Sequence, residues 1–313
     1  MGWWDPAIAA AGLLVGVVVG LTGMGAGALM TPILVFFFGT APLAAISSDV
    51  VASLVMKPIG GFVHLRRGTV HLGLVRWLCL GSVPGGFCGV LLLRLLGDGA
   101  GVQDVVLIAL GAVLVLASLG MVARAYLGLL ARERARTGSG GDTAARLSTL
   151  RPRPLATVLV GVGGGLVVGM TSVGAGSLMI VCLLLLYPAL QARQLVGTDL
   201  VQAVPLVASA SLGHLLFGDF SLVLTVSILI GAIPGVWLGA RMSSRPTGSL
   251  VRRTLPVILL ASGLKLLGAP TAVVLTSCAA AAVGGTAFWA WLRVRHGEPA
   301  FVSLHDRRLR RTA

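Results

Sequence analysis

The sequence predicts an all-α polytopic membrane protein with two inverted-topology repeats, each opening with a glycine-broken helical hairpin, and a C-terminal extra span. Composition is the first reason: 56% of the 313 residues are hydrophobic and 11% are charged, whereas soluble domains carry about 25% charged residues. The second reason is that apolar runs recur with about the 20 residues that cross a bilayer as a helix. The third is an internal duplication.

The duplicated stretch reads GLTGMGAGALM at residues 20–30 and GMTSVGAGSLM at residues 169–179, with seven of eleven positions identical. After one inserted residue the similarity continues at an offset of 150. Self-similarity at a fixed spacing is typical of a repeated structural unit. The further matching pairs are Ser48-Asp49 with Thr198-Asp199, His64 with His214, Gly68 with Gly218, and GSVPGGFCG (81–89) with GAIPGVWLG (231–239).

The apolar runs give the expected elements in order. Two stretches exceed thirty residues, 7–38 and 155–187, and the duplicated glycines interrupt both. The other runs are 44–63, 72–96, 104–127, 195–217, 220–240 and 271–292, with a shorter one at 254–268. We therefore expect a first membrane repeat at 1–127, a basic cytoplasmic linker at 128–153, a second repeat at 154–268, an extra transmembrane helix at 269–292 and a basic cytoplasmic tail at 293–313.

The placement of the arginines predicts the orientation. The formal net charge of +14 lies mainly in short loops, the linker and the tail, as the positive-inside rule predicts, which argues against a nucleic-acid partner. With the linker and tail cytoplasmic, stretch 155–187 must begin and end on one face, because a single crossing would place the later loop arginines outside. By repeat symmetry the N-terminus then lies outside and the halves have opposite topology, as in many secondary transporters. We expect a multi-pass protein of the cell inner membrane.

Other function classes lack their residues. The four cysteines lie scattered in apolar spans without a CxxC spacing, which favours small core residues over disulfides or metal ligands. No arrangement of a catalytic triad, a zinc ligand set or a haem motif is present, so we predict neither an enzyme nor a cofactor. The N-terminus lacks the basic region of a signal peptide, and we expect it to be retained.

The duplicated glycines predict two unwound turns, the first glycine turn (residues 23–27) and the second glycine turn (residues 172–176). Irregular backbone at membrane depth is tolerated only where it is buried in protein or lines a cavity. Because a half-helix N-terminus carries a partial positive charge, two facing turns would suit an anion. The alternative is that the glycines only permit close helix packing. The residues expected to bind substrate here are Thr22, Gly23, Met24, Gly25, Thr171, Ser172, Val173 and Gly174.

Ionisable residues within apolar spans are costly and are functional candidates. Lys57 lies well inside the run 44–63 and is a candidate anion ligand or proton carrier; the alternative is a side chain that extends to the membrane surface, which is favoured for Lys265. Asp49 and Asp199 are proton-coupling candidates, with helix N-capping as the alternative. His64 and His214 are predicted mainly to form interfacial hydrogen bonds, with proton relay as the alternative. Ser48, Thr198 and Gln202 are expected to line the site.

Several of these stretches resemble the TauE/SafE family of sulfite exporters, whose members are also described as probable membrane transporter proteins. The resemblance covers residues 8–268 and implies a duplicated membrane protein that moves small sulfur-containing anions, mainly outward. Two departures are Ile46-Ser47-Ser48-Asp49, where the second half keeps the more usual Val196-Gly197-Thr198-Asp199, and Ala26, where a third glycine is common. The stretches are GLTGMGAGALMTP, LVMKPIGGFVHLRRGTV, VGTDLVQAVPLVASASLGHLLFGDF and GAIPGVWLGARM.

Together these observations predict a secondary transporter that exports sulfite or an organosulfonate and is coupled to protons. The alternatives are an anion channel or uniporter, and an importer of a different small anion. The expected partners are a small anionic substrate and membrane lipid. The sequence leaves both a monomer and a homodimer as alternatives.

Overall fold

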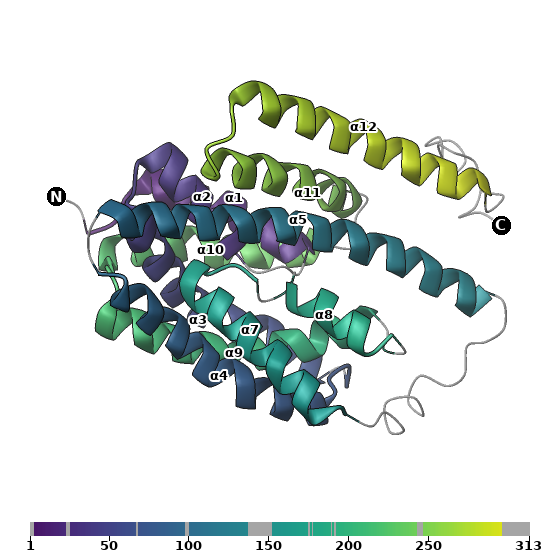
Figure 1. Ribbon diagram of the computed structural model, residues 1–313, viewed down its shortest axis with the longest axis horizontal. Coiled ribbons are helices and arrows are strands. Elements are labelled where there is room, and N and C mark those ends of the chain that lie inside the picture. Colours follow the sequence, from purple (N-terminus) through teal and green to yellow (C-terminus); the bar gives the residue numbers. More distant parts are fainter. Residues whose placement is uncertain are drawn as a thin grey trace.

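A computed structural model of the chain describes residues 3–22, 26–66, 68–97, 100–136, 152–174, 176, 178–188, 190, 192–242 and 247–295. Every regular element within these residues is a helix, as the sequence predicts (Figure 1). The helices are α1 (Pro6–Thr22), α2 (Gly27–Phe38), α3 (Pro42–Arg66), α4 (Leu72–Leu95), α5 (Ala100–Arg136), α7 (Pro154–Thr171), α8 (Leu178–Leu186), α9 (Ala192–Phe217), α10 (Leu222–Met242), α11 (Thr247–Leu266) and α12 (Thr271–Arg295).

Six helical segments are long and apolar enough to cross a membrane. Helix α5 continues to Arg136, so it extends into the region that we assigned to the linker. The predicted extra span lies in α12, which packs against α11 (Figure 1), but its described apolar part, Thr271–Ala287, is shorter than the six. The six are Pro42–Arg66, Leu72–Leu95, Gly101–Ala123, Pro154–Thr171, Gln194–Phe217 and Leu222–Gly239.

The second glycine turn has the unwound backbone that its glycines predict. Ser172 ends α7 in the left-handed conformation with φ 60°, and Gly174 and Gly176 follow with φ 125° and 103°. Left-handed backbone costs a non-glycine residue about 1–2 kcal/mol. Ser172 is the one non-glycine residue with positive φ in the described part of the chain, so its contacts, described below, must offset this strain.

Helix α8 brings the chain back to where α7 began. It has nine residues and is therefore about 14 Å long, roughly half of a bilayer core. Beyond its end, the backbone N–H of Arg153 donates to the hydroxyl of Tyr187 at 2.7 Å, and the hydroxyl of Thr157 lies 2.6 Å from the same oxygen. The long stretch thus begins and ends at the same end of the helix pair.

Glycines allow two helix pairs to pack with their backbones in contact, α1 with α10 and α4 with α7. A Cβ at Gly231 would meet the carbonyl of Ala9, and a Cβ at Gly81 would meet the carbonyl of Val158. The two glycines are repeat-equivalent at an offset of 150, and the two carbonyls at an offset of 149. The same glycine-mediated backbone contact therefore joins the first helix of each half, α1 or α7, to a helix of the other half, α10 or α4.

Substituting Gly81 by alanine is expected to lower the thermal unfolding midpoint of the detergent-purified protein. The new Cβ would meet the carbonyl of Val158 and lie 2.9 Å from the backbone N of Val162, and overpacking of this kind costs about 1–3 kcal/mol. Gly163→Ala on α7 is the matched control, because a Cβ there meets nothing within 4 Å. Equal midpoints for the two variants would contradict the close packing of α4 on α7.

Helices α3 and α9 run antiparallel along each other. Gly61 lies against the backbone of Leu200, and the hydroxyl of Ser211 donates to the carbonyl of Val50 at 3.2 Å. Position 211 is the repeat equivalent of 61, and 200 is the equivalent of 50. The two contacts are thus one contact with the halves exchanged. Asp49 and Asp199 each directly precede a residue of these contacts, and Lys57 lies between the two contacts on α3.

Candidate functional site

The structure buries most of the predicted site residues together in the protein interior. Asp49 and Asp199 are 0% and 1% exposed. Each lies seven residues after the start of its helix, so N-capping is wrong as the role of either carboxylate. The predicted residues Gly23, Met24 and Gly25 lie outside the described residues. The other buried members are Ser48, Lys57, Thr171, Ser172, Val173, Gly174, Thr198, Gln202 and His214.

The carboxylate of Asp49 lies at the second glycine turn, which belongs to the other half of the chain. The hydroxyl of Ser172 donates to Asp49 Oδ2 at 2.6 Å, and the hydroxyl of Thr31 on α2 donates to the same oxygen at 3.2 Å. Among the described residues, the buried Asp49 Oδ1 has no hydrogen-bond partner. A buried polar atom without a hydrogen-bond partner is costly. A transported species that formed a hydrogen bond with this oxygen would therefore be stabilised strongly.

The two glycine turns touch at Gly27 and Ser172. A Cβ at Gly27 would meet the backbone oxygen of Ser172 and would lie 2.7 Å from its hydroxyl. Only glycine therefore lets α2 begin this close to the second turn. The contact places the start of α2, the Ser172 hydroxyl and the Asp49 carboxylate in one cluster, as the prediction of facing turns requires.

Asp199 is held by a different set of groups. The amide nitrogen of Gln202 donates to Asp199 Oδ1 at 3.1 Å and lies 3.2 Å from the sulfur of Met179. The amide oxygen of Gln202 accepts from the hydroxyl of Ser82 at 3.0 Å. Gln202 is thus fixed from both sides, and it holds the carboxylate in place.

Lys57 supplies the positive charge between the two carboxylates. It lies eight residues after Asp49, about two helical turns along α3, and is 9% exposed. Its ammonium group is attracted to the carboxylates of both Asp199 and Asp49. The side chain is therefore buried among protein groups and does not extend to the membrane surface. Lys265, by contrast, makes an exposed contact with the hydroxyl of Thr271 at 3.5 Å.

The two predicted histidines differ in their surroundings. His214 is fully buried, so the expected interfacial position is wrong for this residue. Its Nε2 lies 2.8 Å from the carbonyl of Gly169 and its Nδ1 lies 2.9 Å from the hydroxyl of Ser47. Because a carbonyl only accepts, Nε2 carries the proton, and the ring fixes the end of α7 against α3. His64 is half-buried, with Nδ1 2.9 Å from the hydroxyl of Thr69.

Ser47→Ala is expected to destabilise the protein by about 1–3 kcal/mol, because it leaves the buried Nδ1 of His214 without its hydroxyl partner. Thermal unfolding of the purified protein measures the effect. Ser47→Thr keeps a hydroxyl at the position and serves as the control. If alanine and threonine had the same small effect, the hydrogen bond to His214 would not contribute.

The remaining predicted hydroxyls bond to backbone near helix ends. Thr22 and Thr171 donate to carbonyls of their own helices, at 2.8 Å and 2.7 Å. Thr198 accepts from the backbone N–H of His71 at 3.1 Å, and Ser48 accepts from that of Ser221 at 3.3 Å. The last two contacts are repeat equivalents: the first joins α9 to the loop before α4, and the second joins α3 to the loop before α10. Whether any of the four contacts substrate stays a prediction.

Sequence reasoning missed Thr31, which donates to Asp49, and Ser82 and Met179, which contact Gln202. Thr31 and Met179 carry a signal in hindsight, since both lie directly beside the duplicated glycines. Ser82 has none, because a serine in an apolar run looks like an ordinary small residue.

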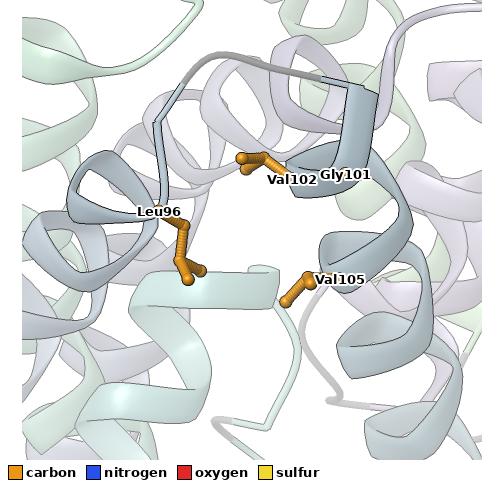
Figure 2. Close-up of a pocket in the computed structure, with 4 residues that line it drawn as sticks. All are labelled: Leu96, Gly101, Val102 and Val105. Atoms are coloured by element: carbon orange, nitrogen blue, oxygen red, sulfur yellow. The ribbon is translucent and has the colours of Figure 1, made fainter.

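Two cavities in the described part of the chain have linings without these polar groups. The smaller has a volume of about 170 Å³ and lies at the α4–α5 connection between Leu96, Gly101, Val102 and Val105 (Figure 2). The larger, about 760 Å³, is an apolar groove on α3, α4 and α9 with Pro58, Phe62 and Val204 among its lining residues. Neither of these two cavities is lined by the buried aspartates.

The comparisons with known proteins agree with this architecture. The family model described as "Sulfite exporter TauE/SafE" matches residues 8–266. The chain is 34% identical over 257 residues to "Probable membrane transporter protein YjnA" of Bacillus subtilis (strain 168), covering 82% of this chain and 97% of that protein. It is 22% identical over 238 residues to "Probable membrane transporter protein YdhB" of the same organism, covering 74% and 87%.

No solved structure matches the chain significantly. The family is one of membrane transporters and not of enzymes. A match over nearly the whole helical part of the chain, with a charged cluster buried among apolar helices, gives one conclusion: the chain belongs to the TauE/SafE sulfite exporter family.

Proposed function

We propose that this membrane transporter exports a small sulfur-containing anion, sulfite or an organosulfonate, and that anion movement is coupled to protons. The observation that carries the proposal is the cluster of Lys57, Asp49 and Asp199 where the second glycine turn meets α2 and α3. A cation and protein dipoles attract an oxyanion. Two carboxylates beside the same site repel an anion unless a proton neutralises one of them, which links proton binding to anion binding.

We also propose that the halves have inverted topology. Two observations support it: contacts between the halves occur in exchanged pairs, such as Gly61 with Leu200 and Ser211 with Val50, and the stretch before Tyr187 returns to Arg153. The arginine-rich linker and tail then lie in the cytoplasm and the N-terminus lies outside the inner membrane. A fluorescent protein that folds only in the cytoplasm should therefore be bright when fused after Ala313; a dark fusion of normal abundance would contradict this orientation.

Transport itself is tested in proteoliposomes of the purified protein loaded with radioactively labelled sulfite. Efflux that changes with an imposed proton gradient supports a proton-coupled transporter. Efflux that ignores the gradient favours the alternative of a channel or uniporter. No efflux above protein-free vesicles would overturn sulfite as the substrate, and organosulfonates and other small anions would follow in the same vesicles. Uptake that exceeds efflux under matched gradients would favour an importer.

A further inference from the structure

We infer that the two repeat-equivalent aspartates have different roles: Asp49 carries the coupling proton, on Oδ1, whereas Asp199 stays ionised as the fixed counter-charge of Lys57. The inference rests on the proposed proton-coupled transport and divides between two residues a role that the repeat symmetry assigns to both. It follows from the hydrogen bonds around each carboxylate and from the contacts of Lys57.

The first argument is the hydrogen-bonding of Asp49. Both hydroxyl donors, Ser172 at 2.6 Å and Thr31 at 3.2 Å, contact Oδ2, while the buried Oδ1 has no partner among the described residues. An ionised carboxylate gains from donors at both oxygens. In a carboxylic acid one oxygen carries the proton and becomes a donor, while the other accepts. The arrangement around Asp49 leaves Oδ1 free to carry a proton, whose O–H would donate to the transported anion, with Oδ2 as the carbonyl oxygen that accepts from Ser172 and Thr31.

The second argument is that the supports of Asp199 have no equivalent at Asp49. Gln202, which donates to Asp199, corresponds to Ala52 in the first half, and Ser82, which fixes Gln202, corresponds to Ala232 in the second. An amide N–H stabilises the ionised carboxylate. The Gln202 and Ser82 side chains therefore support Asp199, and alanine occupies both equivalent positions at Asp49.

The third argument concerns the charges packed around Asp49. On its own helix the nearest along the chain is Lys57, which is attracted to both Asp49 and Asp199. On α9 the ionisable groups are Arg193, Asp199 and His214, and the ring of His214 bonds to the Gly169 carbonyl and the Ser47 hydroxyl. Helices α2 and α7 contain no charged residue. Helix α10 carries its charge at Arg241, near its end. Helix α5 carries charges at Asp104, near its start, and within residues 124–136.

Because Lys57 is attracted to both carboxylates, a proton on Asp49 still leaves the lysine Asp199 as its counter-ion. The loss of a charge at Asp49 instead removes the negative charge nearest the second glycine turn. An anion can then approach the turn and Lys57 together. Proton and anion are therefore bound at the same time, and they leave together.

Infrared difference spectroscopy of the purified full-length protein tests the assignment without any substrate. On acidification a buried carboxylic acid gives a C=O stretching band. We expect the band in the wild type and in Asp199→Asn, and its absence in Asp49→Asn. Ser172→Ala should shift the band to higher frequency, because the Ser172 hydroxyl no longer weakens the Oδ2 carbonyl, whereas Gln202→Leu should leave the frequency unchanged. The assignment would be overturned if the band were lost in Asp199→Asn, or if Gln202→Leu shifted it and Ser172→Ala did not. The band frequencies of Ser172→Ala and Gln202→Leu test the assignment even if Asp49→Asn does not fold.

Flux measurements separate this inference from the proposed function. In proteoliposomes, Asp49→Asn should keep the exchange of labelled for unlabelled sulfite. The change in sulfite flux that an imposed proton gradient causes should be about tenfold smaller than in the wild type. Asp199→Asn should lose exchange as well, because Lys57 loses its counter-ion. Equal losses of exchange in both variants would overturn the division of roles. A wild type that moves no sulfite but shows the Asp49 band would contradict the proposed substrate and leave the proton site standing.

Discussion

Lys57→Met is expected to reduce sulfite flux by about 100-fold or more. The substitution keeps the length of the side chain but removes a buried positive charge that attracts two buried carboxylates. Breaking a buried ion pair by removing one partner costs about 3–5 kcal/mol, and about 1.4 kcal/mol in a barrier changes a rate tenfold. Initial efflux from sulfite-loaded proteoliposomes, normalised to the amount of reconstituted protein, measures the loss.

Lys265→Met is the matched control, since the same chemical change is made on an exposed lysine. A surface substitution is worth at most about 0.5 kcal/mol, so its flux should stay within about twofold of wild type. Lys57→Arg keeps the charge but changes its shape and should give an intermediate flux. Wild-type flux in Lys57→Met would show that the buried lysine takes no part in transport, whatever the transporter moves.

The second large effect is expected for Gly27→Ala, which should strongly reduce flux and lower the thermal unfolding midpoint. The new methyl group would meet the backbone oxygen of Ser172 and lie 2.7 Å from its hydroxyl. Backbone cannot rotate away as a side chain can, so α2 and the second glycine turn must separate, at a cost of about 1–3 kcal/mol. The Ser172 hydroxyl then loses its 2.6 Å contact with Asp49.

Gly101→Ala tests whether any added methyl group has this effect, because a Cβ at Gly101 meets nothing within 4 Å. Its midpoint and flux should match those of the wild type. If Gly27→Ala behaved like Gly101→Ala, the contact between the two turns would not exist in the membrane, and the site would have to be placed elsewhere.

Much of the fold and part of the site could be predicted from the sequence because their signals are local. An apolar run shows a helix, a glycine cluster within it shows a break, and a lysine such as Lys57 in such a run stands out against its neighbours. The break at Ser172–Gly174 was predicted at the position where α7 ends. The duplication extended each of these inferences to the second half.

The rest depends on which helices pack together, and no local pattern reports that. Repeat symmetry predicts equal roles for Asp49 and Asp199, yet their partners, Ser172 and Gln202, lie 123 and 3 residues away along the chain. The burial of His214 likewise follows from its contact with Ser47, 167 residues distant. Ser47 lies at the position where the second half has Gly197. The residue that breaks the repeat pattern is therefore the one that makes the contact with His214.

The charged cluster also determines how the membrane voltage acts on transport. With both aspartates ionised, Lys57, Asp49 and Asp199 together carry one net negative charge, and moving one elementary charge through 100 mV is worth about 2.3 kcal/mol. With a proton on Asp49 the cluster is neutral. A conformational change of the protonated carrier without its anion would then be electrically silent, and the net charge moved in a full cycle would be that of the anion plus that of the proton that leaves with it.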